Sequence, residues 1–460
     1  MDNREKNTRK NKYFGTDGFR GEFGRELLSD HAFLIGRFLG WYFGERLGIT
    51  CRILIGKDTR KSSSALESAL IRGIIRSGGE AYLLGVATTP ALSYLTEVND
   101  FDAAVMITAS HNPFYDNGIK VLNCHGEKLD EETTALLEAY MDGDLLALEI
   151  DGDDLPLGEG ALIDFCGALT EYRWHLIRAA GSLSGAKIGL DCANGAAYKI
   201  APDVFKKLGA EIHLIGTSPD GENINREVGS THTNALAELV CSRGLDMGFA
   251  FDGDGDRCIG IDTTGEVIDG DREMLILAKW LKGLGELSSN TLVTTVMSNK
   301  GLFSALEKKH IKCEITSVGD RFVWEKMMAE DYSLGGEQSG HIIIRKYAST
   351  GDGILTALCL ATIAHKEKKS LAQLSDELVV FPQLTENIPV RDKESIINDP
   401  DVQELYRQVS DEIGDNGRIL IRCSGTENLI RIMVEHKNID KCKQYVDKIR
   451  VLIKRKDEML

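Results

Sequence analysis

A short apolar run that ends in a polar turn is followed, further along the chain, by a second apolar run that ends in a longer polar loop. This unit occurs three times, with the first runs at residues 53–55, 188–190 and 292–296. Short buried strands that alternate with longer amphipathic stretches are typical of parallel α/β folds. The repeat therefore predicts three similar mixed α/β domains.

The second run of each unit leads into a loop that is dense in polar residues. These loops span residues 108–112, 252–257 and 335–341. Open α/β sheets bind ligands outside the carboxyl ends of their strands. Because the loops occupy equivalent places in the repeat, we expect all three to face one shared cleft.

The last part of the chain has a different composition, and the change falls near residues 366–370. Beyond it, strands are expected at 388–390, 418–422 and 429–435, with an amphipathic helix around 401–412 and a basic final helix. This order predicts a smaller α+β domain.

The length alone suggests roughly three or four domains, and the three repeated units with the distinct C-terminal part make four. A chain of 460 residues exceeds the size at which one hydrophobic core keeps growing. The acidic, glycine-rich stretch at residues 141–160 is the expected first linker. We expect domains at 1–155, 156–258, 259–370 and 371–460, carrying in turn the loops at 108–113, 252–257, 336–341 and 422–427.

Charge and composition exclude some partners. Acidic residues (71) outnumber basic ones (54), and the resulting charge of -17 argues against nucleic acid or an anionic membrane as the main partner. No apolar stretch is long enough to span a bilayer. Residues 1–12 lack the apolar core of a signal peptide and are expected to be a frayed tail. Ten scattered cysteines without zinc-site spacing favour reduced thiols in a cytosolic protein.

Three aspartates in alternation with glycine, Asp252, Asp254 and Asp256, give the strongest local signal. Alternate side chains of an extended segment point the same way, so the carboxylates share one side. Two carboxylates about 4 Å apart repel by roughly 4 kcal/mol at an effective dielectric of about 20, so a bound cation is expected. Oxygen ligands select magnesium or calcium. An EF-hand is excluded because its sixth and twelfth positions are Arg257 and Thr263.

Ser110 follows the second run of the first unit, where backbone amides can receive a phosphate. Alone, such a serine is more often a turn former. His111 and Lys120 follow closely, and Arg20 lies in a second glycine-rich polar segment at residues 15–21. None of these side chains alone indicates a phosphate-binding site, but their combination favours one.

Two further polar segments carry candidate ligand-binding groups. Residues 422–427 offer a guanidinium, two hydroxyls and loop amides, which suit an anion, although a plain turn with a surface arginine is an equal alternative. Glu337, Ser339 and His341 offer hydroxyl-binding groups at alternating positions, and turn polarity is the equal alternative for them.

In their order and length these motifs resemble those of the α-D-phosphohexomutases. The similarity covers residues 13 to about 454 and rests on five segments: 13–21, 108–113, 252–257, 336–341 and 422–427. It implies four domains around a central cleft, the first three sharing a mixed α/β topology. This agrees with the repeat.

The resemblance implies a role for each candidate. Ser110 would be the phosphoserine whose phosphate joins Asp252, Asp254 and Asp256 in holding one Mg²⁺. Arg257 would steady that phosphate, and Arg20, Lys120 and His111 would surround the reacting oxygen. Sugar hydroxyls would bind Glu337 and Ser339 near His341. The phosphate that is not transferred would bind the last loop through Arg422, Ser424, Gly425 and Thr426.

The substrate implied is a hexosamine phosphate. Residues 13–21, 318–321 and 337–339 look like the enzymes that convert glucosamine 6-phosphate to glucosamine 1-phosphate on the way to UDP-N-acetylglucosamine. Glucosamine or glucose 1,6-bisphosphate would prime the enzyme, which would be cytoplasmic and, like many relatives, a homodimer. Phosphoglucomutase or phosphomannomutase activity is the alternative within the family. A serine-dependent sugar phosphatase and a silent sugar-phosphate sensor are the alternatives outside it.

One position departs from the family pattern. Asn428 stands where proline commonly follows Thr-Glu. Because proline restricts the backbone, its loss is expected to loosen the loop at 422–427.

Overall fold

The computed structural model describes residues 12–15, 17–150, 152–424 and 428–459. These residues form two compact units. The first contains the described residues up to Met297 together with Lys312–Ser375, and the second contains Ser298–Ile311 and the described residues from Asp376 onward. The expected frayed tail at residues 1–12 lies, except for Lys12, outside the described residues.

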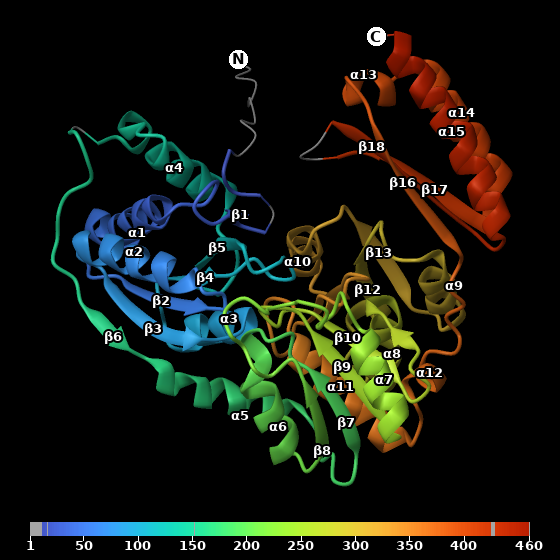
Figure 1. The fold of residues 1–460 in the computed structure, drawn as a ribbon, viewed down its shortest axis with the longest axis horizontal. Helices are drawn as coiled ribbons and strands as arrows, with labels where there is room; N and C mark the ends of the chain where they lie inside the picture. Colours follow the sequence, from blue (N-terminus) through green and yellow to red (C-terminus); the bar gives the residue numbers. More distant parts are fainter. Residues whose placement is uncertain (1–11, 16, 151, 425–427, 460) are drawn as a thin grey trace. The chain divides into compact units, whose positions relative to one another are not determined.

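The first sheet has six strands in the order β1-β5-β4-β2-β3-β6 (Figure 1). β4, β2, β3 and β6 run parallel, whereas β5 turns back against β4 and pairs with β1. β4 is buried along its whole length, as expected for a central strand made of apolar residues. The strands are β1 Phe19–Glu22, β2 Arg52–Lys57, β3 Glu80–Val86, β4 Ala103–Ile107, β5 Asp116–Asn123 and β6 Leu162–Asp164.

Two helices of this region, α3 and α4, follow a residue whose side chain caps them. Thr88 accepts a hydrogen bond from the amide of Ala91, and Asp130 accepts one from that of Thr133. Such caps satisfy amides that have no partner inside the helix. The helices are α1 Ser29–Phe43, α2 Ser63–Arg76, α3 Thr89–Val98 and α4 Glu131–Met141.

The second sheet has five strands in the order β11-β10-β9-β7-β8. β8, β7 and β9 run parallel, and β10 turns back against β9. The strands are β7 Lys187–Asp191, β8 Glu211–Ile215, β9 Met247–Phe251, β10 Cys258–Asp262 and β11 Val267–Ile268. The helices are α5 Leu169–Ala179, α6 Ile200–Lys207 and α7 Asn234–Arg243.

The third sheet has four strands in the order β13-β12-β14-β15. β13, β12 and β14 run parallel, and β15 turns back against β14. The strands are β12 Thr291–Thr295, β13 Lys312–Thr316, β14 Leu334–Gly336 and β15 Ile342–Ile344. The helices are α8 Gly270–Leu284, α10 Asp320–Ala329, α11 Gly353–Glu367 and α12 Leu371–Leu374.

The three sheets share one local arrangement, a parallel strand followed by an antiparallel partner. The hairpin turns that join β4 to β5, β9 to β10 and β14 to β15 carry the three polar loops expected from the sequence. β14 begins at Leu334 rather than earlier, because the amide of Tyr332 donates to the carbonyl of Met327 and so closes the turn after α10. The predicted repeat of mixed α/β domains is confirmed.

The second unit has a three-stranded antiparallel sheet in the order β16-β18-β17. Its strands are β16 Gln383–Pro389, β17 Gly417–Cys423 and β18 Leu429–His436, with helices α9 Lys300–Lys308, α13 Lys393–Ile397, α14 Pro400–Ile413 and α15 Ile439–Met459. Isoleucines and valines of this sheet pack with α14 and α15 into a separate core. The α+β character predicted for the C-terminal part is confirmed. Among the described residues, no helix combines the length and apolar character needed to cross a membrane.

Candidate active site

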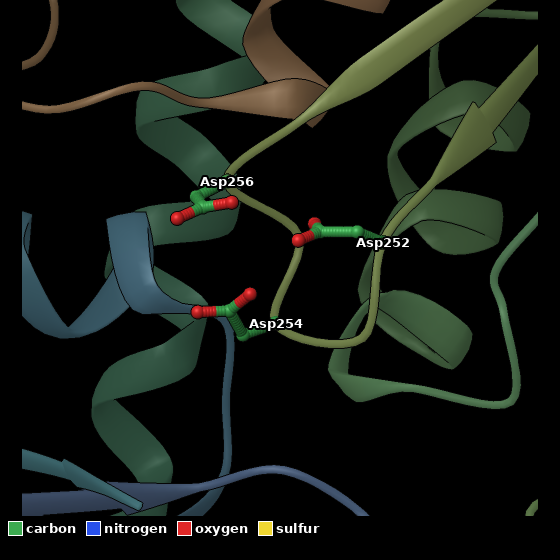
Figure 2. A group of neighbouring side chains, drawn as sticks. All are labelled: Asp252, Asp254 and Asp256. Atoms are coloured by element: carbon green, nitrogen blue, oxygen red, sulfur yellow. The ribbon is translucent and has the colours of Figure 1, made fainter. Parts of the chain in front are cut away.

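The hairpin turn between β9 and β10, residues 252–257, is here called the metal loop. The carboxylates of Asp252, Asp254 and Asp256 are buried, and each offers an oxygen within 4.8 Å of the others. Figure 2 shows the three carboxylates converging on a common space beside the turn. The alternation of aspartate with glycine therefore places the three carboxylates as the sequence predicts.

Backbone hydrogen bonds from three neighbouring segments hold the metal loop. The carbonyl oxygens of Gly253, Asp254 and Gly255 accept from the amides of Ala196, Thr89 and Gly353 at 2.8, 2.9 and 3.0 Å. These bonds fix the backbone of the turn that carries the three carboxylates. Gly255 has a φ of +72°, a conformation that a glycine adopts without strain.

The charges in the metal loop favour a bound cation. Burial and the neighbouring carboxylates raise the pKa of Asp252 well above its usual value. Within the described residues, Asp254 Oδ1 and Asp256 Oδ1 are buried oxygens without a hydrogen-bond donor. Such groups cost free energy unless a partner is supplied. A hard divalent cation that prefers oxygen ligands fits this site.

Lys120, on β5, forms ion pairs with two carboxylates of the metal loop. Its ammonium lies 2.7 Å from Asp254 Oδ2 and 3.3 Å from Asp256 Oδ2, and the side chain is buried. Burial lowers the pKa of Lys120, but the two carboxylates outweigh burial and raise it above the usual value. Lys120 is therefore a fixed positive charge beside the metal loop.

Ser110 faces the same loop from the first sheet. Its hydroxyl donates to Asp252 Oδ2 at 2.6 Å, and its Oγ lies 3.4 Å from His111 Nδ1. The Ser110 backbone adopts a φ of +52°, which is strained for a residue with a Cβ. Its carbonyl is held by Arg60 Nη2 at 2.9 Å and by Asn225 Nδ2 at 2.8 Å.

Arg60 and Asn225 were not among the candidates drawn from the sequence. Arg60 is buried, pairs with Asp58 at 2.9 Å and also donates to the carbonyl of Asn112 at 2.9 Å. The polar turn after the first apolar run was a recognisable feature, but nothing in it indicates that Arg60 reaches the serine loop.

His111, next to Ser110 in the chain, lies beside Arg257, the last residue of the metal loop. Arg257 Nη1 is 3.4 Å from His111 Nδ1. Burial and the charges of Arg257 and Arg20 lower the pKa of His111. Arg20, on β1, pairs with Asp17 at 3.5 Å. The structure thus brings every catalytic candidate of the first two domains to one place.

The loop between β14 and β15, residues 337–341, is here called the sugar loop. A cavity of about 430 Å³ extends from the metal loop to this loop and is lined by Asp256, Arg257, Glu337, Ser339 and His341. Burial, together with the charge of Asp320, raises the pKa of Glu337 although His341 and Arg257 act against it.

His341 is buried beneath the sugar loop. Its Nδ1 lies 3.7 Å from Asp256 Oδ2, and its Nε2 accepts a hydrogen bond from the amide of Gly351 at 3.0 Å. It therefore connects the metal loop with the third sheet.

Arg422 and Ser424 belong to the second unit. Arg422 lies on β17 opposite Arg431 of β18, and burial together with Arg431 lowers the pKa of Arg422. Two guanidinium groups on neighbouring strands suit an anion. Gly425 and Thr426, the other two predicted residues of this loop, lie outside the described residues. Asn428, which replaces the usual proline, accepts a hydrogen bond from the amide of Val390 at 3.0 Å.

Family models match the chain in four consecutive segments. They are phosphoglucomutase/phosphomannomutase alpha/beta/alpha domain I at residues 11–146, domain II at 165–265, domain III at 269–380 and the C-terminal domain at 386–451. The chain belongs to the phosphoglucomutase/phosphomannomutase family.

Two curated relatives with high identity to the chain are phosphoglucosamine mutases. The chain is 48% identical over 448 residues to the phosphoglucosamine mutase of Lachnoclostridium phytofermentans, covering 97% of this chain and 98% of that protein. It is 46% identical to the phosphoglucosamine mutase of Bacillus cereus strain B4264, covering 96% and 98% of the two chains.

Solved structures share the fold. A phosphoglucomutase/phosphomannomutase family protein from Burkholderia thailandensis matches with a TM-score of 0.81 at 21% identity, over 96% of this chain and 97% of that one. An N-acetylphosphoglucosamine mutase from Aspergillus fumigatus, solved with GlcNAc-6P and magnesium, matches with a TM-score of 0.67 at 16% identity, over 97% and 96%.

Proposed function

We propose that this chain is a magnesium-dependent isomerase that converts glucosamine 6-phosphate to glucosamine 1-phosphate through a phosphorylated Ser110. The observation that carries the proposal is the 2.6 Å contact between Ser110 Oγ and Asp252 of the buried carboxylate triad. The identity of 46 to 48% to phosphoglucosamine mutases over nearly the whole chain supports the choice of sugar.

The chemistry is a transfer of one phosphoryl group in each direction. An oxygen of the sugar hydroxyl bonds to phosphorus, the bond from phosphorus to Ser110 Oγ breaks, and the hydroxyl proton ends on Ser110 Oγ. The product is a sugar 1,6-bisphosphate, which reorients and returns its other phosphate to Ser110. Free glucosamine or glucose 1,6-bisphosphate would prime an unphosphorylated enzyme.

Asp252, Asp254 and Asp256 would hold the Mg²⁺, which supplies charge neutralisation for the transferred phosphoryl group. Positioning and neutralisation of spread negative charge are most of what phosphoryl transfer requires. Lys120, which pairs with Asp254 and Asp256, and Arg257, which lies beside His111 and Asp256, would add further positive charge for the same purpose. After transfer, the Ser110 hydroxyl donates to Asp252, as it does in the structure.

The other two loops would each bind a different part of the substrate. Glu337 and Ser339 would bind sugar hydroxyls, and Arg422 with Ser424, Gly425 and Thr426 would hold whichever phosphate is not reacting. We propose four domains, at 1–155, 156–258, 259–370 and 371–460. They carry, in that order, the loop of Ser110, the metal loop, the sugar loop and the loop of Arg422. We also propose a cytoplasmic homodimer, and light scattering of the purified chain measures its mass.

A coupled assay with glucosamine, glucose and mannose 6-phosphates tests the substrate, with Mg²⁺ and catalytic bisphosphate present. We expect the glucosamine phosphate to give the highest kcat/KM and almost no free phosphate. A preference for glucose or mannose phosphate would move the chain to another activity of the family. Stoichiometric release of phosphate would instead indicate a serine-dependent phosphatase.

A further inference from the structure

Helix α10 contacts the turn that follows β5 through polar side chains. Trp324 Nε1 donates to Glu127 Oε1 at 3.0 Å, and Lys128 Nζ lies 2.6 Å from Asp320 Oδ1. The turn continues the strand that carries Lys120, and α10 precedes the strand that ends at the sugar loop. These contacts therefore link the catalytic side of the first domain to the sugar loop of the third.

Lys128 lies between carboxylates of two domains. Besides Asp320 it contacts Asp17 Oδ1 at 3.3 Å, and Asp17 in turn pairs with Arg20 at 3.5 Å. Asp17 and Asp320 both line the cavity of about 430 Å³ that also contains Asp256. Without the Lys128 ammonium, like charges would repel across this cavity.

Asp320 is tied to the sugar-binding carboxylate through its neighbour. The amide of Gly319 donates to Glu337 Oε1 at 3.1 Å, and Gly319 has a φ of +130°, which side chains rarely adopt. The Asp320 carboxylate also accepts from the amide of Arg321 at 2.8 Å, which fixes it at the start of α10. A shift of Asp320 therefore moves the donor that holds Glu337.

We propose that Lys128 and Asp320 are a positioning pair that sets the place of Glu337 relative to Ser110. Neither side chain is assigned a chemical step. The inference rests on the proposed function for the statement that Glu337 binds the sugar. Displacement of a bound substrate by about 1 Å lowers a rate by up to about 100-fold, so the pair acts on the transfer step.

The test compares Lys128→Ala, Asp320→Asn and the double variant in the full-length enzyme with Mg²⁺, using glucosamine 6-phosphate and glucose 1,6-bisphosphate. We expect each single variant to lose about 10-fold to 100-fold in kcat. The double variant should be no slower than the slower single variant, because one contact is lost in all three. Lys128→Arg should recover most of the rate.

A second readout separates positioning from damage to the fold or to the serine site. The phosphoserine of each variant is formed with the bisphosphate, and its slow hydrolysis by water is followed without sugar. We expect hydrolysis at the wild-type rate, because water needs no alignment by Glu337. The control is Glu131→Ala. Glu131 of α4 makes an exposed ion pair with Arg321 of α10, and its loss should leave kcat unchanged.

Wild-type kcat in Lys128→Ala would overturn the pair, and so would losses that add in the double variant. Equal slowing of hydrolysis and of transfer would show general damage and would overturn it as well. Failure of the proposed function is distinct, because it appears in the wild-type chain as a lack of conversion of the glucosamine phosphate, and it would overturn both statements.

Discussion

The hydroxyl of Ser110 and the carboxylate of Asp252 are 142 positions apart in the sequence and 2.6 Å apart in the structure. They lie on hairpin turns of two different sheets, so the contact exists only when the first two domains are packed together. Gly253 allows this approach, because a Cβ at that position would lie 2.4 Å from the Ser110 carbonyl oxygen. Serine and metal loop are thus one site built from two repeats.

Replacing Ser110 with alanine removes the atom that is proposed to carry the phosphoryl group. We expect Ser110→Ala to lose turnover by at least about 1,000-fold, as nucleophile loss does in other enzymes. Intact-mass spectrometry after incubation with bisphosphate should show no added phosphate. Ser242→Ala, on the exposed end of α7, is the matched control, and substantial turnover by Ser110→Ala would remove Ser110 from the mechanism.

Asp254→Asn tests the metal loop. The amide keeps the size of the side chain but removes one of three buried negative charges, so we expect a higher Mg²⁺ concentration for half-maximal rate and a kcat lowered by about 10-fold or more. The measurement is a magnesium titration of initial rates. Glu238→Gln, an exposed change on α7, should leave the titration curve in place. An unshifted curve for Asp254→Asn would argue that the cation binds elsewhere.

Much of this arrangement was predictable from local sequence. Asp252, Asp254 and Asp256 alternate with glycines after an apolar strand, and that pattern alone implies convergent carboxylates. The role of Arg60 was not predictable. Its side chain donates to the Ser110 carbonyl, which is distant in the sequence and comes close only in the folded chain. The same holds for Asn225, which reaches that carbonyl from the segment between β8 and α7.

The sugar loop shows a second limit of what the sequence alone can predict. Glu337 is recognisable as a polar loop residue, but its place is set by the amide of Gly319, 18 positions away. Spacing along the chain predicts which loops exist and at which strand ends they lie. It does not predict which backbone amides orient a carboxylate, since that depends on packing between elements.

Arg422→Ala tests the predicted phosphate loop of the second unit. Loss of a guanidinium that binds the idle phosphate should raise KM for the sugar phosphate by about 10-fold to 100-fold, because charge-assisted bonds contribute about 1.5–3 kcal/mol. Serine phosphorylation by bisphosphate should change less. Steady-state kinetics give KM, and Arg407→Ala, on the exposed face of α14, is the control. An unaltered KM would exclude Arg422 from substrate binding.

Asp352, the N-cap of α11, should make the stability of the first unit depend on pH. It accepts from the Leu355 amide at 2.9 Å and from the Tyr172 hydroxyl at 2.7 Å, and burial raises its pKa to about 6. Because this pKa is higher in the folded chain, the stabilising contribution is complete below the unfolded pKa and is lost as pH rises through 6. The loss amounts to about 3 kcal/mol.

Asp352→Asn keeps an acceptor for the Leu355 amide and cannot ionise. Its melting temperature, measured by calorimetry at pH 5 and pH 8, should therefore fall less with rising pH than that of the wild-type chain. Asp130→Asn is the opposite control: hydrogen bonds from Thr133 outweigh burial and lower the pKa of this exposed cap, so its contribution is lost toward low pH. If Asp352→Asn and the wild type had parallel pH profiles, Asp352 would be ionised in the folded chain at pH 5, and burial would not control its charge.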